Sequence, residues 1–433
     1  MARWRANETR SHHTHALGRW PANLSTLATR LAPALLPTLA AGAALAGPLT
    51  PPAGPVGPTT TGIEETDPRI EIDALPFTII APGSYYLTQD LTSAGTTGVT
   101  VLIDDVSIDL NGFTLRGPGT GLDNGITVVG ALSNIVIQRG TIELWGGDGV
   151  HAAMASSGVI DQITSADNGG DGLDVGDAWV ITNCTVRSNS GRGIGGGCGG
   201  IIDGAVADGN GAEGFALGDG WIVEDSAAIN NVACGFMLAS GASVASSSAV
   251  DNTDAGFAIG RGSAIADCVS TQNDVGFRLG SASTANHCTA EGGNTGFETL
   301  LDTGAQIVGC LARNTGGDGF NVVGGVVRAC LAVGNNGNGV VAADGSLVED
   351  CVARGNNGVG VLIDGFGSTA TRNTLISNAV GMQLNGANNL ATRNVASLSA
   401  TDDYIFTPTN AFGQVSFVTG AFQINSSYNN LVY

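Results

Sequence analysis

The sequence contains no lysine, and it is poor in charge of any kind. All 17 basic residues are arginine, against 38 acidic residues, so the formal net charge is -21. Charged residues make up 13% of the chain, where about a quarter is usual. Proteins that bind nucleic acid through its phosphates need clustered positive charge. The composition therefore excludes nucleic acid as a partner.

Long apolar runs are also scarce. The run at 31–46, LAPALLPTLAAGAALA, is interrupted by Pro33 and Pro37 and is shorter than the roughly 20 apolar residues that cross a bilayer. It follows an arginine-containing segment and ends in Ala-Leu-Ala, the small-residue pattern of a cleaved export signal. We expect residues 1–46 to be an export signal, or else a disordered leader, and the mature chain to have no membrane span. The protein is then secreted, periplasmic or on the cell surface.

A stretch rich in Pro, Gly and Thr follows the signal. Such a composition cannot bury a core, so residues 47–69 are predicted to form an extended linker.

Glycine is the residue in excess, with 67 copies. A glycine before a large apolar residue recurs every 20–24 positions, at Gly125, Gly149, Gly172, Gly193, Gly214, Gly235, Gly256, Gly276, Gly296, Gly319, Gly339, Gly360 and Gly381. Apolar residues stand at the first and third places after it, as in GFALG at 214–218, which is the period of a strand. A strand-containing unit this short can bury its apolar side chains only against the units before and after it. The sequence predicts an all-β solenoid in which like residues stack.

Two columns illustrate this stacking. Phenylalanines at 215, 236, 257, 277, 297 and 320 are predicted to form an internal column. Asparagines at 168, 189, 210, 231, 252, 273 and 294, followed by 314, 335, 356 and 378, are predicted to form a ladder at a turn.

Six of the eight cysteines share one register, at positions 184, 268, 288, 310, 330 and 351. Ala205, Ser226 and Ser247 occupy the same register in other coils, so we expect buried free thiols rather than disulfides. The spacing also lacks a close Cys-x-x-Cys pair typical of a metal site. Cys198 and Cys234 fall outside the column and have no predicted role.

The stretches LPFTIIAPGSYYLTQDL at 75–91 and VTVLIDDVSIDLNGFTLRG at 99–117 resemble the N-terminal part of exported bacterial right-handed parallel β-helix proteins of the pectate-lyase-like superfamily. With the coils, this resemblance covers about residues 70–395. It implies a right-handed parallel β-helix with an N-terminal cap and first coil at 70–118, repeats at 119–395 and a C-terminal strand cap at 396–433. The superfamily contains enzymes and proteins of no known activity, so the fold alone does not assign a function. The sequence motifs of polygalacturonases and alginate epimerases are absent.

One group of polar residues could carry chemistry. Asp148 and Asp171 precede marker glycines on consecutive coils, Arg192 continues that register, and His151 and Asp174 share another register two places after the glycine. Two carboxylates one coil apart would lie roughly 5 Å from each other, as in a retaining glycosidase, with His151 as a proton carrier. The alternative is a solvated acidic face, which a chain of this charge is expected to have.

The segment GGDGLDVGD at 169–177 matches once the glycine-rich nonapeptide that binds calcium in repeats-in-toxin proteins. Calcium at Asp171, Asp174 and Asp177 is therefore a second hypothesis for this region, and the sequence suggests no other cofactor.

The repeat register also places five arginines one coil away from an acid. The expected pairs are Arg187 with Asp208, Arg192 with Glu213, Arg278 with Glu298, Arg313 with Glu291 and Arg328 with Glu349.

Two hypotheses of function follow. The first is a non-catalytic surface or envelope protein that binds a polysaccharide or a cell-surface protein, or serves as a rigid spacer. The second is a polysaccharide-cleaving enzyme that uses the aspartates of residues 148–177.

Overall fold

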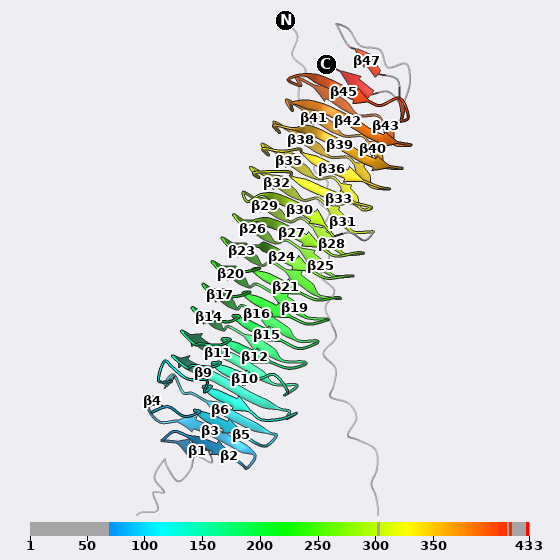
Figure 1. The fold of residues 1–433 in the computed structure, drawn as a ribbon. Coiled ribbons are helices and arrows are strands. Elements are labelled where there is room, and N and C mark those ends of the chain that lie inside the picture. The colour runs from blue at the N-terminus through cyan, green and yellow to red at the C-terminus, as the bar shows by residue number, and fades with distance from the viewer. Residues whose placement is uncertain (1–68, 301–303, 414, 418–429, 433) are drawn as a thin grey trace, which may run out of the picture. The chain divides into compact units, whose positions relative to one another are not determined.

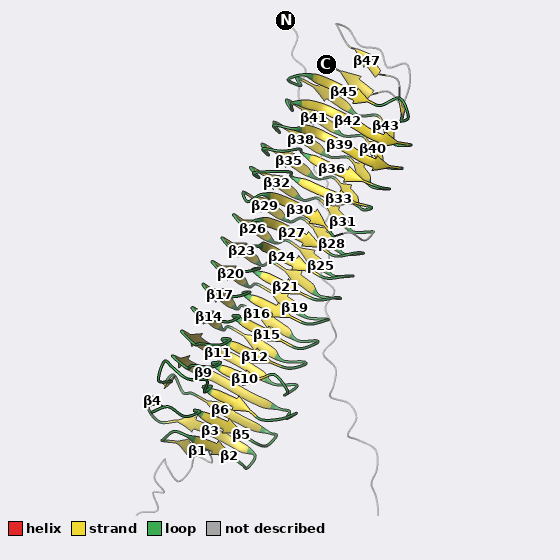
Figure 2. Ribbon diagram, in the orientation of Figure 1, coloured by secondary structure: helices red, strands yellow, loops and turns green. Residues whose placement is uncertain are grey.

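A computed structural model describes residues 69–300, 304–413, 415–417 and 430–432. The predicted export signal lies outside these residues, as does all of the predicted linker except Arg69. The described residues form strands and turns without a helix, and so include no helix that could span a membrane. Figure 1 shows short strands stacked coil upon coil, and Figure 2 shows that loops alone connect them.

The strands form three columns in which every pairing is parallel, because each coil places its strands beside those of the coils before and after it. The first column is a sheet of its own with sixteen strands: β2 (Phe77–Ile79), β5 (Val99–Val101), β8 (Ile126–Val128), β10 (Val150–Ala152), β12 (Leu173–Val175), β15 (Ile194–Gly196), β18 (Phe215–Leu217), β21 (Phe236–Leu238), β24 (Ala255–Ile259), β27 (Val275–Leu279), β30 (Thr295–Thr299), β33 (Phe320–Val323), β36 (Val340–Ala343), β39 (Val359–Phe366), β42 (Val380–Ala387) and β45 (Asp402–Phe406).

The second and third columns belong to one sheet, because the long strands β9 (Ile135–Glu143) and β11 (Val159–Ala166) run through both. The second column also contains β1 (Ile70–Ile72), β3 (Gly83–Leu87), β6 (Val106–Asp109), β13 (Val180–Thr182), β16 (Ile201–Asp203), β19 (Ile222–Glu224), β22 (Ser243–Ala245), β25 (Ala264–Ala266), β28 (Thr284–Asn286), β31 (Gln306–Val308), β34 (Val326–Arg328), β37 (Leu347–Glu349), β40 (Thr369–Thr371), β43 (Leu390–Thr392) and β46 (Ala411–Phe412). The third contains β4 (Leu91–Thr92), β7 (Thr114–Arg116), β14 (Thr185–Arg187), β17 (Val206–Asp208), β20 (Ala227–Ile229), β23 (Ser248–Val250), β26 (Val269–Thr271), β29 (Thr289–Glu291), β32 (Leu311–Arg313), β35 (Leu331–Val333), β38 (Val352–Arg354), β41 (Thr374–Ile376), β44 (Val395–Ser397), β47 (Val415–Phe417) and β48 (Asn430–Val432).

The predicted all-β solenoid is thus confirmed, with about one coil for each strand of the first column. The parallel stacking continues past residue 395, where the repeats were expected to end, because β45 pairs with β42. The segment expected to form the N-terminal cap, at 70–118, contains strands β1–β7 that pair within the same three columns.

The phenylalanine column is confirmed. The six rings are fully buried, and successive rings stack with centroids 4.5–5.1 Å apart and planes within 10° of parallel. In-register parallel strands impose this arrangement, because equivalent side chains on neighbouring coils must leave the backbone in the same direction. The stack fills the interior behind the first column.

The asparagine ladder is confirmed over most of its length and is interrupted in the middle. From Asn168 to Asn273 each side chain is buried, and the Oδ1 of one residue accepts hydrogen bonds from the backbone N–H of the residue one coil earlier, as at Asn210 and Asn231 (3.0 Å). The prediction is wrong at Asn294 and Asn314, which are exposed. Thr315 takes the ladder position and bonds to Asn335, since the coils between Gly276 and Gly319 contain 20 and then 23 residues.

Replacing Asn231 by Ala is expected to lower the free energy of unfolding by about 1–3 kcal/mol. Its buried Oδ1 accepts hydrogen bonds from the backbone N–H and the Nδ2 of Asn210 (both 3.0 Å), and its Nδ2 donates to the carbonyl of Ala207 (3.1 Å), so these groups would lose a partner. Denaturant unfolding measures the change. Asn294→Ala, at an exposed position, is the control and should change stability by less than about 0.5 kcal/mol. Equal effects of both substitutions would contradict the interrupted ladder.

Candidate active site

A short hydrogen-bonded ladder of polar residues runs along the start of the first column. The Oδ1 of Asn124 accepts the backbone N–H of Asp148 (2.7 Å), Oδ1 of Asp148 accepts that of Asp171 (2.7 Å), and Oδ1 of Asp171 accepts that of Arg192 (2.6 Å). Each aspartate thus uses one oxygen to hold the next coil in place. Its other oxygen, Oδ2, is left for other contacts.

His151 and Asp174 lie side by side on the outward face of β10 and β12, where they are register partners as predicted. The Nδ1 atom of His151 is 2.9 Å from Oδ2 of Asp148 and 3.2 Å from Oδ2 of Asp174. Two carboxylates therefore converge on one imidazole nitrogen. The side chain of His151 is 40% exposed, whereas those of Asp148 and Asp174 are 19% and 18% exposed. A ligand can reach the imidazole while the carboxylates are largely shielded from water.

Arg192 completes the cluster from the next coil. Its Nε and Nη2 atoms lie 2.9 and 2.7 Å from Oδ2 of Asp171, and Nη2 lies 3.7 Å from Oδ1 of Asp174. A Cβ atom at Gly195 would come within 3.0 Å of the guanidinium carbon, so glycine at this position gives Arg192 room to lie against the strand. The arginine pairs with the coil before it, whereas the sequence placed it beside Glu213.

The electrostatics distinguish Asp174 from its neighbours. Burial raises the pKa of Asp174, and the charges of Asp148 and Asp171 raise it further, while Arg192 and His151 act in the opposite direction. Asp171 is compensated by Arg192, which contacts it through backbone and side chain. Asp148 accepts the backbone N–H of Asp171 through its Oδ1. The carboxyl of Asp174 therefore retains its proton to higher pH than an ordinary aspartate does.

The structure gathers all five residues predicted as catalytic: Asp148, His151, Asp171, Asp174 and Arg192. Asn124 and Gly195 also shape the site, and the sequence prediction missed both. Asn124 could have been found, because it precedes the marker Gly125 in the register of Asp148 and Asp171. Gly195 carries no such signal, since its role depends on where the Arg192 side chain lies.

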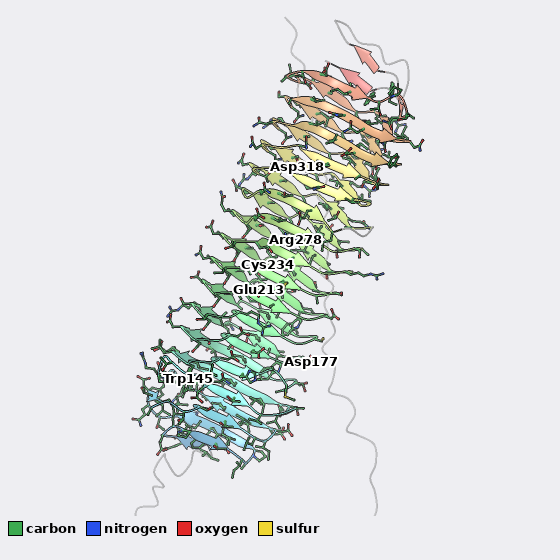
Figure 3. All side chains as sticks on the ribbon, in the orientation of Figure 1. Trp145, Asp177, Glu213, Cys234, Arg278 and Asp318 are labelled. Atoms are coloured by element: carbon green, nitrogen blue, oxygen red, sulfur yellow. The ribbon has the colours of Figure 1, made fainter. Side chains whose placement is uncertain are left out.

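Asp177 lies apart from this cluster. It follows the end of β12 by two residues, and its Oδ1 accepts the backbone N–H of Cys198 (2.6 Å). Figure 3 labels Asp177 and also Glu213, which precedes β18, so the two mark opposite ends of the first-column strands. Among the described residues, the potential metal ligands that converge to within 4.8 Å are Asp148, His151 and Asp174 rather than the calcium set predicted from Asp171, Asp174 and Asp177.

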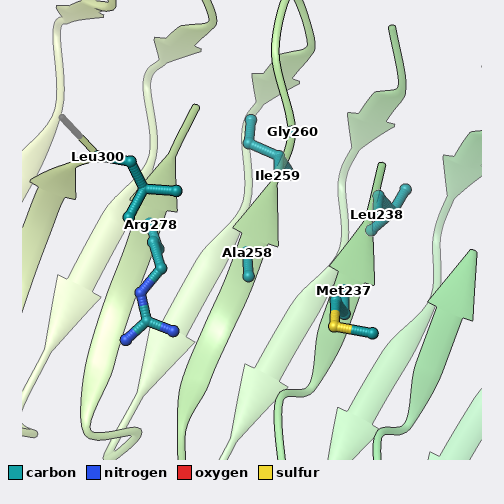
Figure 4. Close-up of a pocket in the computed structure, with 7 residues that line it drawn as sticks. All are labelled: Met237, Leu238, Ala258, Ile259, Gly260, Arg278 and Leu300. Carbon is teal, nitrogen blue, oxygen red and sulfur yellow. The ribbon is translucent and has the colours of Figure 1, made fainter. Parts of the chain in front are cut away.

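The same outward face carries a second ion-paired group around Arg278, four coils beyond the coil of Arg192. The Nε of Arg278 lies 2.6 Å from Glu298, its predicted partner, and Nη2 lies 3.2 Å from Asp254. Beside it is a shallow pocket of about 170 Å³ (Figure 4), lined by Met237, Leu238, Ala258, Ile259, Gly260, Arg278 and Leu300. Gly195 and Ala216 occupy the outward strand positions between the five-residue cluster and Met237.

Two other predicted pairs, Glu291 with Arg313 and Arg328 with Glu349 (2.8 Å), form as ion pairs. Arg187 aligns with Asp208 across β14 and β17. These pairs are on the other sheet and do not contribute to the cluster.

The family comparison agrees with the coil geometry. Residues 91–220 match the family model described as the right handed beta helix region. The described coils have the fold of a right-handed parallel β-helix. Among curated proteins, none matches its sequence.

Several solved structures are similar to this β-helix in part. A pectate lyase has 15% identity and a TM-score of 0.35, with 48% of this chain and 66% of that chain covered. The A-module of a mannuronan C-5 epimerase from Azotobacter vinelandii has 14% identity and a TM-score of 0.33, covering 76% of this chain and 90% of that chain. The catalytic domain of a GH87 α-1,3-glucanase has 9% identity and a TM-score of 0.33, covering 76% and 63%. Likeness at this level does not say what the present β-helix binds or does.

Proposed function

We propose that the β-helix is an exported glycoside hydrolase that cleaves an uncharged polysaccharide at the cluster around His151. The observation that carries this proposal is the convergence of Asp148 and Asp174 on one imidazole nitrogen, with the three ligating atoms within 4.8 Å of one another. Hydrolysis of a glycosidic bond needs two carboxyl groups, one protonated and one ionised. Asp174, whose pKa is raised, is suited to hold the proton, and Asp148 lies on the same imidazole nitrogen beside it.

Asp174 is the proton donor in this proposal. Its pKa is raised by burial and by two neighbouring carboxylates, so it holds a proton under conditions where ordinary aspartates do not. Among the described contacts, none brings a backbone N–H to its carboxylate. The proton can therefore be passed to the oxygen of the leaving sugar without breaking a structural hydrogen bond.

Asp148 is the nucleophile. The backbone N–H of Asp171 donates to its Oδ1, which fixes the orientation of the carboxylate. Carboxyl groups about 5–5.5 Å apart are typical of enzymes that retain the anomeric configuration, whereas inverting enzymes separate them by about 6.5–9.5 Å. The closeness of Asp148 and Asp174 therefore favours retention. Asp171, which the sequence paired with Asp148 for this role, is instead bound to Arg192.

His151 and Arg192 are positioning residues for the two carboxyl groups. The imidazole lies between Asp148 and Asp174 and holds the two carboxyl groups in place, while Asp174 itself gives up its proton in the first half of the reaction and takes one from water in the second. The guanidinium holds Asp171 in place and faces Oδ1 of Asp174 at 3.7 Å. Both side chains stay outside the covalent steps.

The substrate class follows from charge. The formal net charge of -21 repels polyanionic glycans, and the cluster itself contains more acids than bases. Polysaccharide is the class implied by the resemblance to pectate-lyase-like β-helix proteins. An uncharged polysaccharide meets these conditions.

The test is a panel of neutral and acidic polysaccharides incubated with the protein, with release of reducing ends as the readout. We expect cleavage of a neutral glycan, a product of retained configuration by NMR, and complete loss of cleavage in Asp148→Asn. Asp318→Asn is the matched control, because Asp318 also accepts the backbone N–H of the next coil (2.7 Å, Asn338). Loss in both variants, or cleavage only of acidic glycans, would contradict the proposal.

A non-catalytic surface protein that binds a glycan or a cell-surface protein is the second candidate. The hydrogen bonds that Asp148 and Asp171 accept from backbone N–H groups of the following coils favour it, because they give both acids a structural role without chemistry. This candidate predicts retention of a glycan on an affinity column with no reducing ends released.

A further inference from the structure

Six inward-facing cysteines lie at the turn between the second and third columns, and their exposed fractions are 0–2%. Five of them are on consecutive coils: Cys268, Cys288, Cys310, Cys330 and Cys351. All are free thiols. The sixth, Cys184, has Ala205 as its neighbour in the column. The chain thus carries an unbroken stack of five thiols inside the solenoid, outside the proposed active site.

Cysteines on neighbouring coils of this column are hydrogen-bonded to one another. The backbone N–H of Cys288 donates to Sγ of Cys310, and that of Cys310 donates to Sγ of Cys330, both at 3.4 Å. Strands on either side of the turn are in register, with Asn286 beside Val308 and Thr289 beside Leu311. Neighbouring Cα atoms are then about one strand spacing apart, roughly 4.8 Å. This is within the range of about 4.4–6.8 Å found across disulfides.

We propose that this five-cysteine column is an oxidation site, in which hydrogen peroxide joins neighbouring thiols as disulfides that link successive coils. Peroxide is small enough to enter where larger disulfide oxidants are excluded. The column holds the second thiol in place before the first has reacted, so each oxidised sulfur has a partner one coil away.

The chemistry proceeds in two steps. A thiolate attacks peroxide, the O–O bond breaks, and sulfenic acid and hydroxide form; a neighbouring thiol then attacks the sulfenic sulfur, its proton leaves with the hydroxyl as water, and the S–S bond forms. Sulfur is oxidised and peroxide is reduced, so no other reactant is needed.

The column limits how many bonds can form. Only thiols on adjacent coils can pair, and five thiols in a row allow at most two disulfides with one thiol left over. Cys184 has no cysteine on the next coil and Cys234 lies on the outward side near Asp254 (3.4 Å), so both should remain reduced. A bond can also move along the column, since the remaining thiol can attack the disulfide beside it.

The experiment uses the full chain carrying Cys198→Ser, which removes the exposed thiol. Peroxide treatment should reduce the count of maleimide-reactive thiols in the denatured protein from seven to three, and a phosphine reductant should restore all seven. Peptide mapping should find links only between neighbours in the column. Serine occupies the same register at Ser226 and Ser247, so serine variants are expected to fold.

Two variants distinguish disulfide formation between neighbours in the column from non-specific oxidation of the protein. With Cys310→Ser two adjacent pairs remain, so peroxide should still consume four thiols. With Cys288→Ser and Cys330→Ser together no two column cysteines are adjacent, and peroxide should form no disulfide. The proposal is overturned if the parent protein keeps all seven thiols, if the double variant forms disulfides, or if Cys184 or Cys234 is found in a link.

Discussion

Replacing Phe257 by Asp is expected to abolish cooperative folding of the β-helix. Phe257 is fully buried, and its ring stacks between those of Phe236 (4.8 Å) and Phe277 (5.1 Å). The substitution removes both stacking contacts and buries a carboxylate with no partner in an apolar column. An uncompensated buried charge costs about 3–5 kcal/mol, to which the lost aromatic packing of about 3–5 kcal/mol is added. Together these approach the whole stability of an ordinary domain.

Circular dichroism during heating measures the result, with the soluble fraction on expression as a second readout. Met237→Asp is the matched control. It lies one coil away on β21, but its side chain points outward and is 42% exposed, so the protein should fold and melt cooperatively. Phe257→Leu should fold with reduced stability because the position stays apolar. A soluble Phe257→Asp protein that melts like the parent would rule out the internal column.

The residue columns could be predicted from the sequence because equivalent residues of successive coils stack on one another. Where a coil keeps its length, a residue and its equivalent 20 or 21 positions later occupy the same site, as Phe236, Phe257 and Phe277 do. The five-residue cluster around His151 follows from the same rule, since Asp148 and Asp171 share one register and His151 and Asp174 share another.

The prediction fails where coil length changes. Asn294 keeps the 21-residue spacing of the asparagines, while the phenylalanine strands step by 20 residues there, so Asn294 is shifted off the ladder. Spacing alone does not say which turn takes up a missing or extra residue. Hydrogen bonding decides it, and Thr315 rather than Asn314 meets Asn335.

Long side chains were the other source of error. Arg192 can reach the coil before it or the coil after it, and register cannot distinguish Asp171 from Glu213. The structure selects Asp171, because that carboxylate already accepts the backbone N–H of Arg192 and so lies beside the guanidinium. The pairing in turn leaves Asp174 as the carboxyl with the raised pKa.

Replacing Asp174 by Asn is expected to lower kcat/KM on the cleaved glycan by about 100- to 10,000-fold, the usual contribution of a general acid. The amide has nearly the shape of the carboxyl group and cannot deliver the proton. Initial rates of reducing-end release measure the loss. Asp254→Asn is a useful control, because Asp254 is also an acid paired with an arginine on this face and should leave the rate unchanged.

The same residue sets a pH dependence of activity and of stability. Since its proton is the one transferred, kcat/KM should fall as pH rises through the raised pKa of Asp174 in the folded protein.

The folded protein also holds the proton of Asp174 more tightly than the unfolded chain does, because in the unfolded chain the pKa of this carboxyl stays near the ordinary value of 3.8. The free energy of unfolding therefore loses a contribution as pH rises from about that value through the folded pKa. Asp174→Asn lacks this loss, so at neutral pH it should unfold at a higher temperature than the parent while being nearly inactive. An inactive variant that is less stable at neutral pH would mean that the Asp174 carboxylate holds the cluster together, and that its role is structural.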